Sequence, residues 1–197
     1  MNNAGRSQRA LFSETQLSVD QEMFDVNVFS TVNLSRLLMS HWYEKKEPGH
    51  LVVVSSLAGI SGAPQSATYS ATKHALHGYF ETIRMEGYSK GIKVTMLCPG
   101  PVFSNIISRA FTGTPGQVVG AIHDKSNKRM ETSRCADLMA VAIVNQLSVS
   151  WICQQPILSY YYLNQYMPGW CKLLLPRFVT LEKMKKMREG GETTNHV

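Results

Sequence analysis

The sequence lacks the cysteine patterns that build metal sites or disulfide frameworks. Its four cysteines are widely spaced and form no C-x-x-C pair, so we expect them to be reduced and buried. They are Cys98, Cys135, Cys153 and Cys171. Zinc-finger spacings, RNP-like segments and Gly/Arg tracts are also missing, so the net charge of +6 does not indicate a nucleic-acid partner.

The two neighbouring histidines do not indicate a metal site either. His74 and His77 stand at i, i+3 and could in principle share a metal, but no carboxylate or cysteine partner is evident. We interpret both as histidines on a helix surface, and we expect no metal.

No apolar run is long enough to span a membrane. The segment from Pro156 is rich in Tyr and Trp, but Asn164, Gln165 and Pro168 interrupt it well short of ~20 apolar residues. Aromatic rings followed by cations favour contact of residues 156–188 with a membrane surface. A helix that covers a substrate pocket or a partner subunit is the equal alternative. We therefore divide the chain into residues 1–155 and an aromatic segment with a basic tail, residues 156–197.

Apolar residues make up 44% of the 197 residues and charged residues 17%, which is typical of one globular domain with a sizeable core. Residues 51–55 and 92–98 are apolar enough for buried parallel strands, and residues 151–155 are expected to form the last strand.

Helices are expected between these strands. Ser18-Val19-Asp20-Gln21 matches a capping box and predicts a helix that ends near Lys46. Its buried stripe is expected at i, i+4, i+7 and i+11, namely Asn27, Thr31, Leu34 and Leu38. A further helix is expected to start at Ser133 as its N-cap.

Residues 51–78 contain a candidate catalytic site. Their pattern predicts a strand, a Gly/Pro-containing loop and a helix. Ser56 ends the strand, Tyr69 lies in the first turn of a helix that opens near Ala67, and Lys73 follows at i+4. A tyrosine ionises near pH ~10, and a neighbouring cation favours the phenolate and lowers the pKa of the phenol. This tuning is what a general acid or base at neutral pH requires, and the serine could hold a substrate oxygen.

Together with three further motifs, these residues resemble the short-chain dehydrogenase/reductase family. Ser56 and Tyr69-x-x-x-Lys73 match its catalytic signature, and Asn27 falls where the family has a fourth catalytic residue. The family's NNAG motif is matched by Asn2-Asn3-Ala4-Gly5, and its PG-x-V-x-T segment by Pro99-Gly100-Pro101-Val102-Phe103-Ser104. A lone Tyr-x-x-x-Lys is common by chance, but four motifs in the right order are specific. RSQRALF, TSRC and QYMPGW are similar to one membrane-associated branch of the family.

The resemblance implies a Rossmann-like, doubly wound parallel α/β sheet. In the family NNAG ends the fourth strand, and no G-x-x-x-G-x-G occurs in this chain, so we expect a truncated fold without the first strands and the glycine-rich turn. Residues 1–155 then correspond to the C-terminal part of the catalytic domain.

The resemblance also implies roles for the site residues. Tyr69 exchanges a proton with the substrate oxygen, Ser56 holds that oxygen, Lys73 lowers the pKa of Tyr69 and bonds the nicotinamide ribose, and Asn27 orders a relay water. The cofactor-binding positions are Asn3, Ala4, Gly5, Tyr69, Lys73, Pro99, Gly100, Val102 and Ser104.

The expected activity is reduction of a lipophilic carbonyl, such as a steroid, retinoid or xenobiotic ketone, or oxidation of the alcohol. We expect NADP(H) rather than NAD(H), and this expectation rests only on what is common in the family. The small residues Ala71, Ala75 and Gly78 on one helix face suggest a homo-oligomer, and the resemblance suggests the endoplasmic reticulum membrane. The alternative is a catalytically inert fragment or isoform that acts only by binding or oligomerising.

Overall fold

The computed structural model describes residues 1–120, 129–171 and 173. Its sheet has three parallel strands in the order β1-β2-β3: β1 (Gly49–Val54), β2 (Ile92–Pro99) and β3 (Val149–Ile152). The register pairs Val52 with Thr95 and Leu97 with Ser150. Asn2 adds a parallel bridge to Val53 on the free side of β1. The predicted parallel α/β fold is confirmed, although the last strand begins before residue 151 and ends at Ile152.

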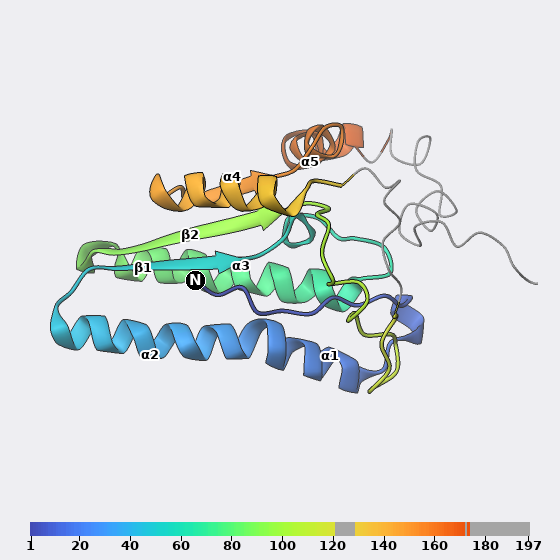
Figure 1. Ribbon diagram of the computed structural model, residues 1–197, viewed down its shortest axis with the longest axis horizontal. Helices are drawn as coiled ribbons and strands as arrows, with labels where there is room; N and C mark the ends of the chain where they lie inside the picture. The colour runs from blue at the N-terminus through green and yellow to red at the C-terminus, as the bar shows by residue number, and fades with distance from the viewer. Residues whose placement is uncertain (121–128, 172, 174–197) are drawn as a thin grey trace, which may run out of the picture.

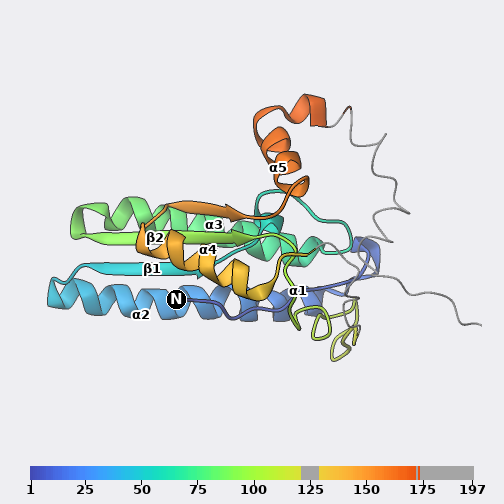
Figure 2. The same cartoon turned by 45° about the horizontal axis from the view of Figure 1, so that its top comes forward.

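Helices cover both faces of this sheet. Figure 1 shows α2 (Ser30–Lys45) and α4 (Thr132–Val144) on opposite sides of the strands, with α3 (Ala67–Gly87) packed beside β1 and β2. α1 (Leu17–Phe24) leads into α2 and contacts α3. α5 (Ile157–Tyr166) follows β3 and projects from the layered body in Figure 2. The chain therefore has the three-layer arrangement of a doubly wound sheet.

Each face of the sheet has its own apolar core, because side chains alternate between the faces along a strand. On one face Leu51 and Val53 of β1 pack with Leu76 and Phe80 of α3. On the other face Val52 and Leu97 pack with residues of α4. These fully buried clusters fix the position of α3 relative to the ends of β1 and β2.

Two predicted helix starts are wrong. α1 begins at Leu17 with Gln16 as its N-cap, so Ser18 lies inside the helix and makes no capping hydrogen bond. α4 begins at Thr132 with Glu131 as its N-cap, so Ser133 does not cap it either. In both cases an extended residue nearer the N-terminus starts the helix without a side-chain cap.

The predicted buried stripe of the long helix is correct only at its start. Asn27 and Thr31 are buried, whereas Leu34 and Leu38 are 54% and 44% exposed. Residues 25–29 form a π-helical turn, which contains one residue more than an α-turn. Beyond Thr31 the buried positions are Ser35 and Met39, each one residue after the predicted one.

The segment between β2 and α4 contains only isolated bridges among its described residues. Phe111 pairs with Gln8, and Val102 pairs with Met130. The loop after β2 thus contacts the N-terminal segment, while residues 121–128 lie outside the described part.

The C-terminal segment is described only through α5 and a few residues beyond it. No residue of α5 is buried, although Tyr162 contacts Trp151 of β3 with ring centroids 5.1 Å apart. Among the described residues, no helix combines the length and hydropathy needed to cross a bilayer. Most of the predicted basic tail lies outside the described residues, and the division at residue 155 stays a prediction.

Candidate active site

The predicted site residues converge because three parallel segments end at the same edge of the sheet. Asn2 pairs in parallel with Val53, so residues 3–5 leave the edge at which β1 delivers Ser56. β2 is parallel to β1 and delivers Gly100 to the same edge. This carboxyl edge is where ligands bind in open α/β sheets.

Ser56 is held at the end of β1 by backbone groups on both sides. Its hydroxyl donates to the Pro99 carbonyl at 3.4 Å and accepts from the Ala58 amide at 3.1 Å. The loop that follows packs directly on α3: a Cβ on Gly59 would lie 2.8 Å from the Lys73 carbonyl oxygen. The missing side chain at Gly59 thus lets the strand end approach the helix that carries Tyr69.

Tyr69 is the third residue of α3 and faces Ser56. Burial raises the pKa of Tyr69 above its ordinary value, while a side-chain hydrogen bond with Ser56 and the positive charge of Arg9 act in the opposite direction. The ring is partly buried against Val19, Met23 and Phe111. The phenol is therefore protonated at neutral pH and has a hydroxyl partner at the sheet edge.

Lys73 lies one turn further along α3, as the spacing predicted. Its side chain is buried, its Nζ donates to the Val54 carbonyl at 2.8 Å, and Nζ is 5.8 Å from the centre of the Tyr69 ring. Burial lowers the pKa of Lys73 to about 8, partly opposed by the nearby Cys98. The structure thus brings Ser56, Tyr69 and Lys73 together in one place.

Asn27 is fully buried in the π-helical turn and satisfies its whole side-chain amide. Its Oδ1 accepts from the Arg6 amide at 2.8 Å, and its Nδ2 donates to the Arg6 carbonyl at 2.9 Å and to Thr72 Oγ1 at 3.0 Å. The side chain therefore ties the segment after residue 5 to the helix that carries Tyr69 and Lys73.

The predicted cofactor positions lie along the same edge and are largely open. Asn3, Ala4, Gly5 and Ser104 are exposed, while Pro99, Gly100 and Val102 are half-buried. A Cβ on Gly5 would lie 3.2 Å from Asn27 Oδ1 and 3.6 Å from Lys73 Nζ. The absence of a side chain at Gly5 therefore lets this segment approach Asn27 and Lys73 closely.

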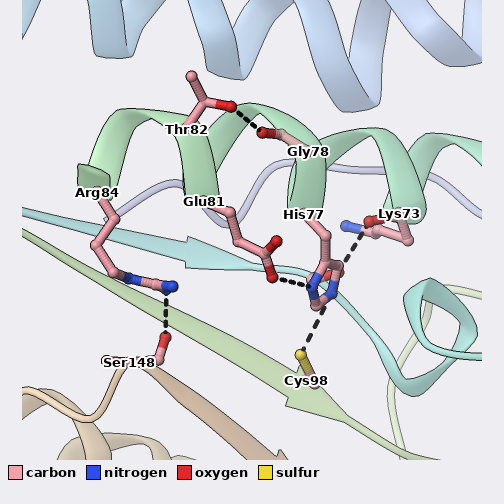
Figure 3. Close-up of polar contacts among 9 residues, drawn as sticks. Lys73, His77, Gly78, Glu81, Thr82, Arg84, Cys98 and Ser148 are labelled. Carbon is pink, nitrogen blue, oxygen red and sulfur yellow. Dashed lines mark hydrogen bonds and ion pairs between the residues drawn. The ribbon is translucent and has the colours of Figure 1, made fainter. Parts of the chain in front are cut away.

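His77 is not on the helix surface, so that prediction is wrong. Its side chain is only 13% exposed and lies between α3 and β2, with Nε2 3.7 Å from Cys98 Sγ and Nδ1 4.0 Å from Glu81 Oε1 (Figure 3). Burial lowers the pKa of His77 to about 4, and nearby cations act in the same direction. His74 is exposed, as expected.

The cysteines are free, as predicted. Cys98, Cys135 and Cys171 are buried and Cys153 is half-buried. Burial raises the pKa of the Cys98 thiol to about 12, so this thiol stays protonated. Within the described residues, no group of three metal-ligating side chains is present.

Sequence reasoning named Lys73 as the cation beside Tyr69 and missed Arg9. The charge of Arg9 acts on the Tyr69 phenol, and its Nη1 donates to Ser66 Oγ at 2.6 Å, directly before α3 begins. Nothing local marks this arginine, because its partner Ser66 is 57 residues away in sequence.

Comparison with known proteins agrees with this geometry. A model of the short chain dehydrogenase family matches residues 1–113, more than half of the chain. The chain belongs to the short-chain dehydrogenase family. The human protein "Dehydrogenase/reductase SDR family member 7" is 42% identical over 171 residues, which are 86% of this chain and 50% of that protein. The resemblance to this branch, predicted from RSQRALF, TSRC and QYMPGW, is confirmed.

Solved structures support the same fold. A short-chain dehydrogenase from Sphingobium yanoikuyae in complex with NADPH superposes with a TM-score of 0.65 at 18% identity, covering 91% of this chain and 65% of that one. A 4-hydroxyisoleucine dehydrogenase complexed with NADH has a TM-score of 0.59 at 22% identity, covering 77% and 64%. The chain spans about half the length of the human relative it matches.

Proposed function

We propose that this chain carries the acid/base half of a nicotinamide-dependent oxidoreductase that interconverts a carbonyl and an alcohol. The observation that supports the proposal most directly is that Ser56, Tyr69 and Lys73 meet at one sheet edge: the buried Lys73 Nζ lies 5.8 Å from the centre of the Tyr69 ring, and Ser56 acts on the pKa of the phenol. A bound NAD(P)H supplies the hydride that goes to the carbonyl carbon.

In this proposal Tyr69 gives its phenolic proton to the substrate oxygen in reduction and takes it back in oxidation. Ser56 donates a hydrogen bond to the same oxygen, which fixes the carbonyl beside the phenol. The raised pKa of Tyr69 keeps the acid protonated before reaction, and the charge of Arg9 stabilises the phenolate that forms.

Lys73 and Asn27 have supporting roles. Lys73 Nζ donates to the Val54 carbonyl and lies beside Gly5 at the carboxyl edge of the sheet, where we propose that it bonds a ribose hydroxyl. The side chain of Asn27 is used up by its hydrogen bonds to the Arg6 backbone and to Thr72, so we propose that its main chain, in the π-helical turn, orders the relay water.

The cofactor is proposed to be NADP(H) in preference to NAD(H). The fold neighbours were solved with NADPH and with NADH, which supports a nicotinamide without choosing between the two. The cofactor would lie against the edge residues predicted above, from Asn3 to Gly5 and from Pro99 to Ser104.

The substrate is proposed to be a lipophilic carbonyl such as a steroid, retinoid or xenobiotic ketone. The aromatic α5, with Tyr166 75% exposed, supports contact of residues 156–188 with a membrane surface, and an endoplasmic reticulum location remains part of the proposal. A groove of about 750 Å³ between α2 and α3, lined in part by Ala75 and Gly78, supports self-association.

Replacement of Tyr69 by Phe tests the chemistry in an enzyme that joins this chain to a glycine-rich cofactor turn. We expect Tyr69→Phe to lose at least ~100-fold in carbonyl reduction, the low end for general acid catalysis, while NADPH still binds. NADPH consumption and NADPH fluorescence measure the two properties. Tyr79→Phe, on the exposed side of the same helix, is the control. Reduction at a comparable rate in Tyr69→Phe would show that another group supplies the proton.

A further inference from the structure

The helix that carries Tyr69 is not capped by the residue directly before it. Ser66 precedes α3, and serine is among the residues that most often bind the first amides of a helix through the side chain. The Ser66 hydroxyl makes no such bond to α3. It donates instead to the Gln8 carbonyl at 2.8 Å and accepts from Arg9 Nη1 at 2.6 Å. The first amides of α3 therefore need an acceptor from another part of the chain.

Gln8 supplies this acceptor from a segment 60 residues away in sequence. Its Oε1 accepts from the amide of Thr68, the second residue of α3, at 3.2 Å, which is the bond that an N-cap side chain normally makes. Its Nε2 donates to Thr15 Oγ1 at 2.7 Å, and the Thr15 hydroxyl donates to the Leu11 carbonyl at 2.9 Å. Thr15 thus presents an acceptor to Nε2, which directs Oε1 toward α3.

A carboxylate holds the side chain of the same residue of α3. Thr68 Oγ1 donates to the Asp20 carboxylate of α1, so the amide and the hydroxyl of Thr68 are both bonded to segments outside α3. A negative charge at this place also suits the N-terminal end of a helix. The first turn of α3 is therefore held from two sides, immediately before Tyr69.

The segment that carries Gln8 is itself fixed against the loop after β2. Gln8 forms a parallel bridge with Phe111, whose amide donates to the Ser7 carbonyl at 2.9 Å and whose carbonyl accepts from the Arg9 amide at 2.8 Å. Phe111 also belongs to the small apolar cluster that packs against Tyr69. The residue that fixes the backbone around Gln8 therefore also contributes to the packing around Tyr69.

We propose that Gln8 is a positioning residue for the reaction, because by capping α3 from outside it holds Tyr69 where the phenol reaches the substrate oxygen. This role rests on the proposed function, in which Tyr69 is the acid. Gln8 acts through α3, since its side chain is fully buried and closed to a ligand. Such placement matters because a shift of ~1 Å in a reacting group can cost ~100-fold in rate.

A competing explanation is that Gln8 stabilises α3 and has no influence on the reaction. The two explanations differ in what they predict for the folded molecules. A loss of stability lowers the amount of folded enzyme and leaves the turnover of each folded molecule unchanged. A displaced Tyr69 lowers the turnover of folded molecules and leaves their binding of NADPH nearly unchanged.

Gln8→Met tests the cap in this chain, because methionine has a similar length and lacks the acceptor. We expect the Thr68 amide to exchange its hydrogen at least ~5-fold faster, the factor that corresponds to a cap worth ~1 kcal/mol. NMR-detected hydrogen exchange measures this rate. The Cζ carbon resonance of Tyr69 responds to the hydrogen bond of the phenol and should move in the same variant. Tyr69→Phe identifies that resonance.

Gln16→Met is the matched control, because it makes the same change at an exposed residue before α1 whose side chain forms no capping bond. It should leave the Thr68 exchange rate and the Tyr69 resonance as in the wild type. Gln8→Glu is the conservative variant, since its carboxylate keeps an acceptor for the Thr68 amide. It should restore both signals toward their wild-type values.

Turnover is measured in the enzyme that joins this chain to a glycine-rich cofactor turn. Gln8→Met should lower kcat for carbonyl reduction by ~10- to 100-fold, while KM for NADPH changes by less than about twofold. The concentration of folded enzyme is taken from the NADPH sites titrated by fluorescence, so unfolded molecules do not count. Gln8→Glu should recover most of the lost kcat.

Circular dichroism reports whether Gln8→Met folds. If it does not, Thr15→Val is the second variant, because it removes only the hydroxyl that accepts from Gln8 Nε2. It is expected to change the Thr68 exchange rate, the Tyr69 resonance and kcat in the same directions by smaller factors.

Faster exchange of the Thr68 amide with an unmoved Tyr69 resonance would reduce Gln8 to a stabilising cap and would overturn the positioning role. So would unchanged exchange, or an unchanged kcat per folded molecule. A wild-type joined enzyme that reduces no carbonyl would count against the proposed function instead. The two NMR signals of this chain would then still decide whether Gln8 positions Tyr69, so the two failures are distinguishable.

Discussion

Asn27 makes three hydrogen bonds that only an amide side chain can make. Its oxygen meets a donor, and its nitrogen meets two acceptors, the Arg6 carbonyl and Thr72 Oγ1. The Thr72 hydroxyl itself donates to the Tyr69 carbonyl at 2.8 Å, so it presents an acceptor to Asn27. Asn27 thereby links the cofactor-side segment to the backbone of the residue proposed as the acid.

Replacement of Asn27 by Asp should therefore destabilise the chain. A carboxylate in this position would face two acceptor oxygens in a fully buried site, and we expect a loss of ~2–4 kcal/mol in the free energy of unfolding at pH 7. Urea denaturation measures it. Asn33→Asp, at an exposed position of α2, is the control and should change stability by less than ~0.5 kcal/mol. A loss in Asn27→Asp no larger than in the control would contradict this account.

At the residue scale the sequence predicted what depends on local spacing. Tyr69 and Lys73 are four residues apart on one helix, and any α-helix brings such a pair together. Arg9 could not be predicted in this way, because it approaches the site from a loop whose course depends on contacts with residues far away in sequence.

At the scale of elements, the contact between α3 and β2 includes the buried pair of His77 and Cys98 shown in Figure 3. The pKa of His77 is lowered to about 4 in the folded chain, against about 6.5 when unfolded. Above pH 6.5 the histidine is neutral in both states. As the pH falls from 6.5 to 4, the unfolded chain takes up the proton first, so stability decreases over this window.

We expect His77 to account for ~2–3 kcal/mol of acid-induced destabilisation between pH 6.5 and pH 4. His77→Leu should remove this share, so its free energy of unfolding should fall less over the same window. Urea denaturation at several pH values measures the difference. His74→Gln, one turn earlier and exposed, should follow the wild type. An unchanged pH dependence in His77→Leu would show that His77 is not the buried neutral group described.

The elements also show where pattern reasoning fails. The predicted stripe of α2 ran through Leu34 and Leu38, but the buried face runs through Ser35 and Met39 instead. No hydrophobic pattern marks this face, because it leaves two leucines exposed and buries a serine, whereas the uniformly apolar β1 and β2 were predicted to within a few residues.

At the scale of the whole molecule, three strands and their helices provide one edge of a site but no glycine-rich turn. The sequence contains no G-x-x-x-G-x-G, and the pyrophosphate of a dinucleotide is normally held by that turn and the helix after it. A chain that acts by binding alone is therefore the alternative to an independent enzyme.

Titration with NADPH distinguishes these alternatives. We expect this chain alone to bind NADPH more weakly than about 1 mM, because the edge residues contact only the nicotinamide end and forfeit the pyrophosphate contacts. NADPH fluorescence measures the affinity, and NADH in parallel measures any preference. A dissociation constant for NADPH well below 1 mM would show that this chain alone forms a sufficient cofactor site. It would then count against the alternative of a catalytically inert chain that acts only by binding a partner.

The sequence alone determined the strand-loop-helix unit that presents Ser56, Tyr69 and Lys73, because strand hydrophobicity and helical spacing act over a few residues. Only the tertiary structure decided the charge around Tyr69. That charge depends on how deeply each group is buried and on which loop brings Arg9 near, and both follow from packing between segments distant in sequence.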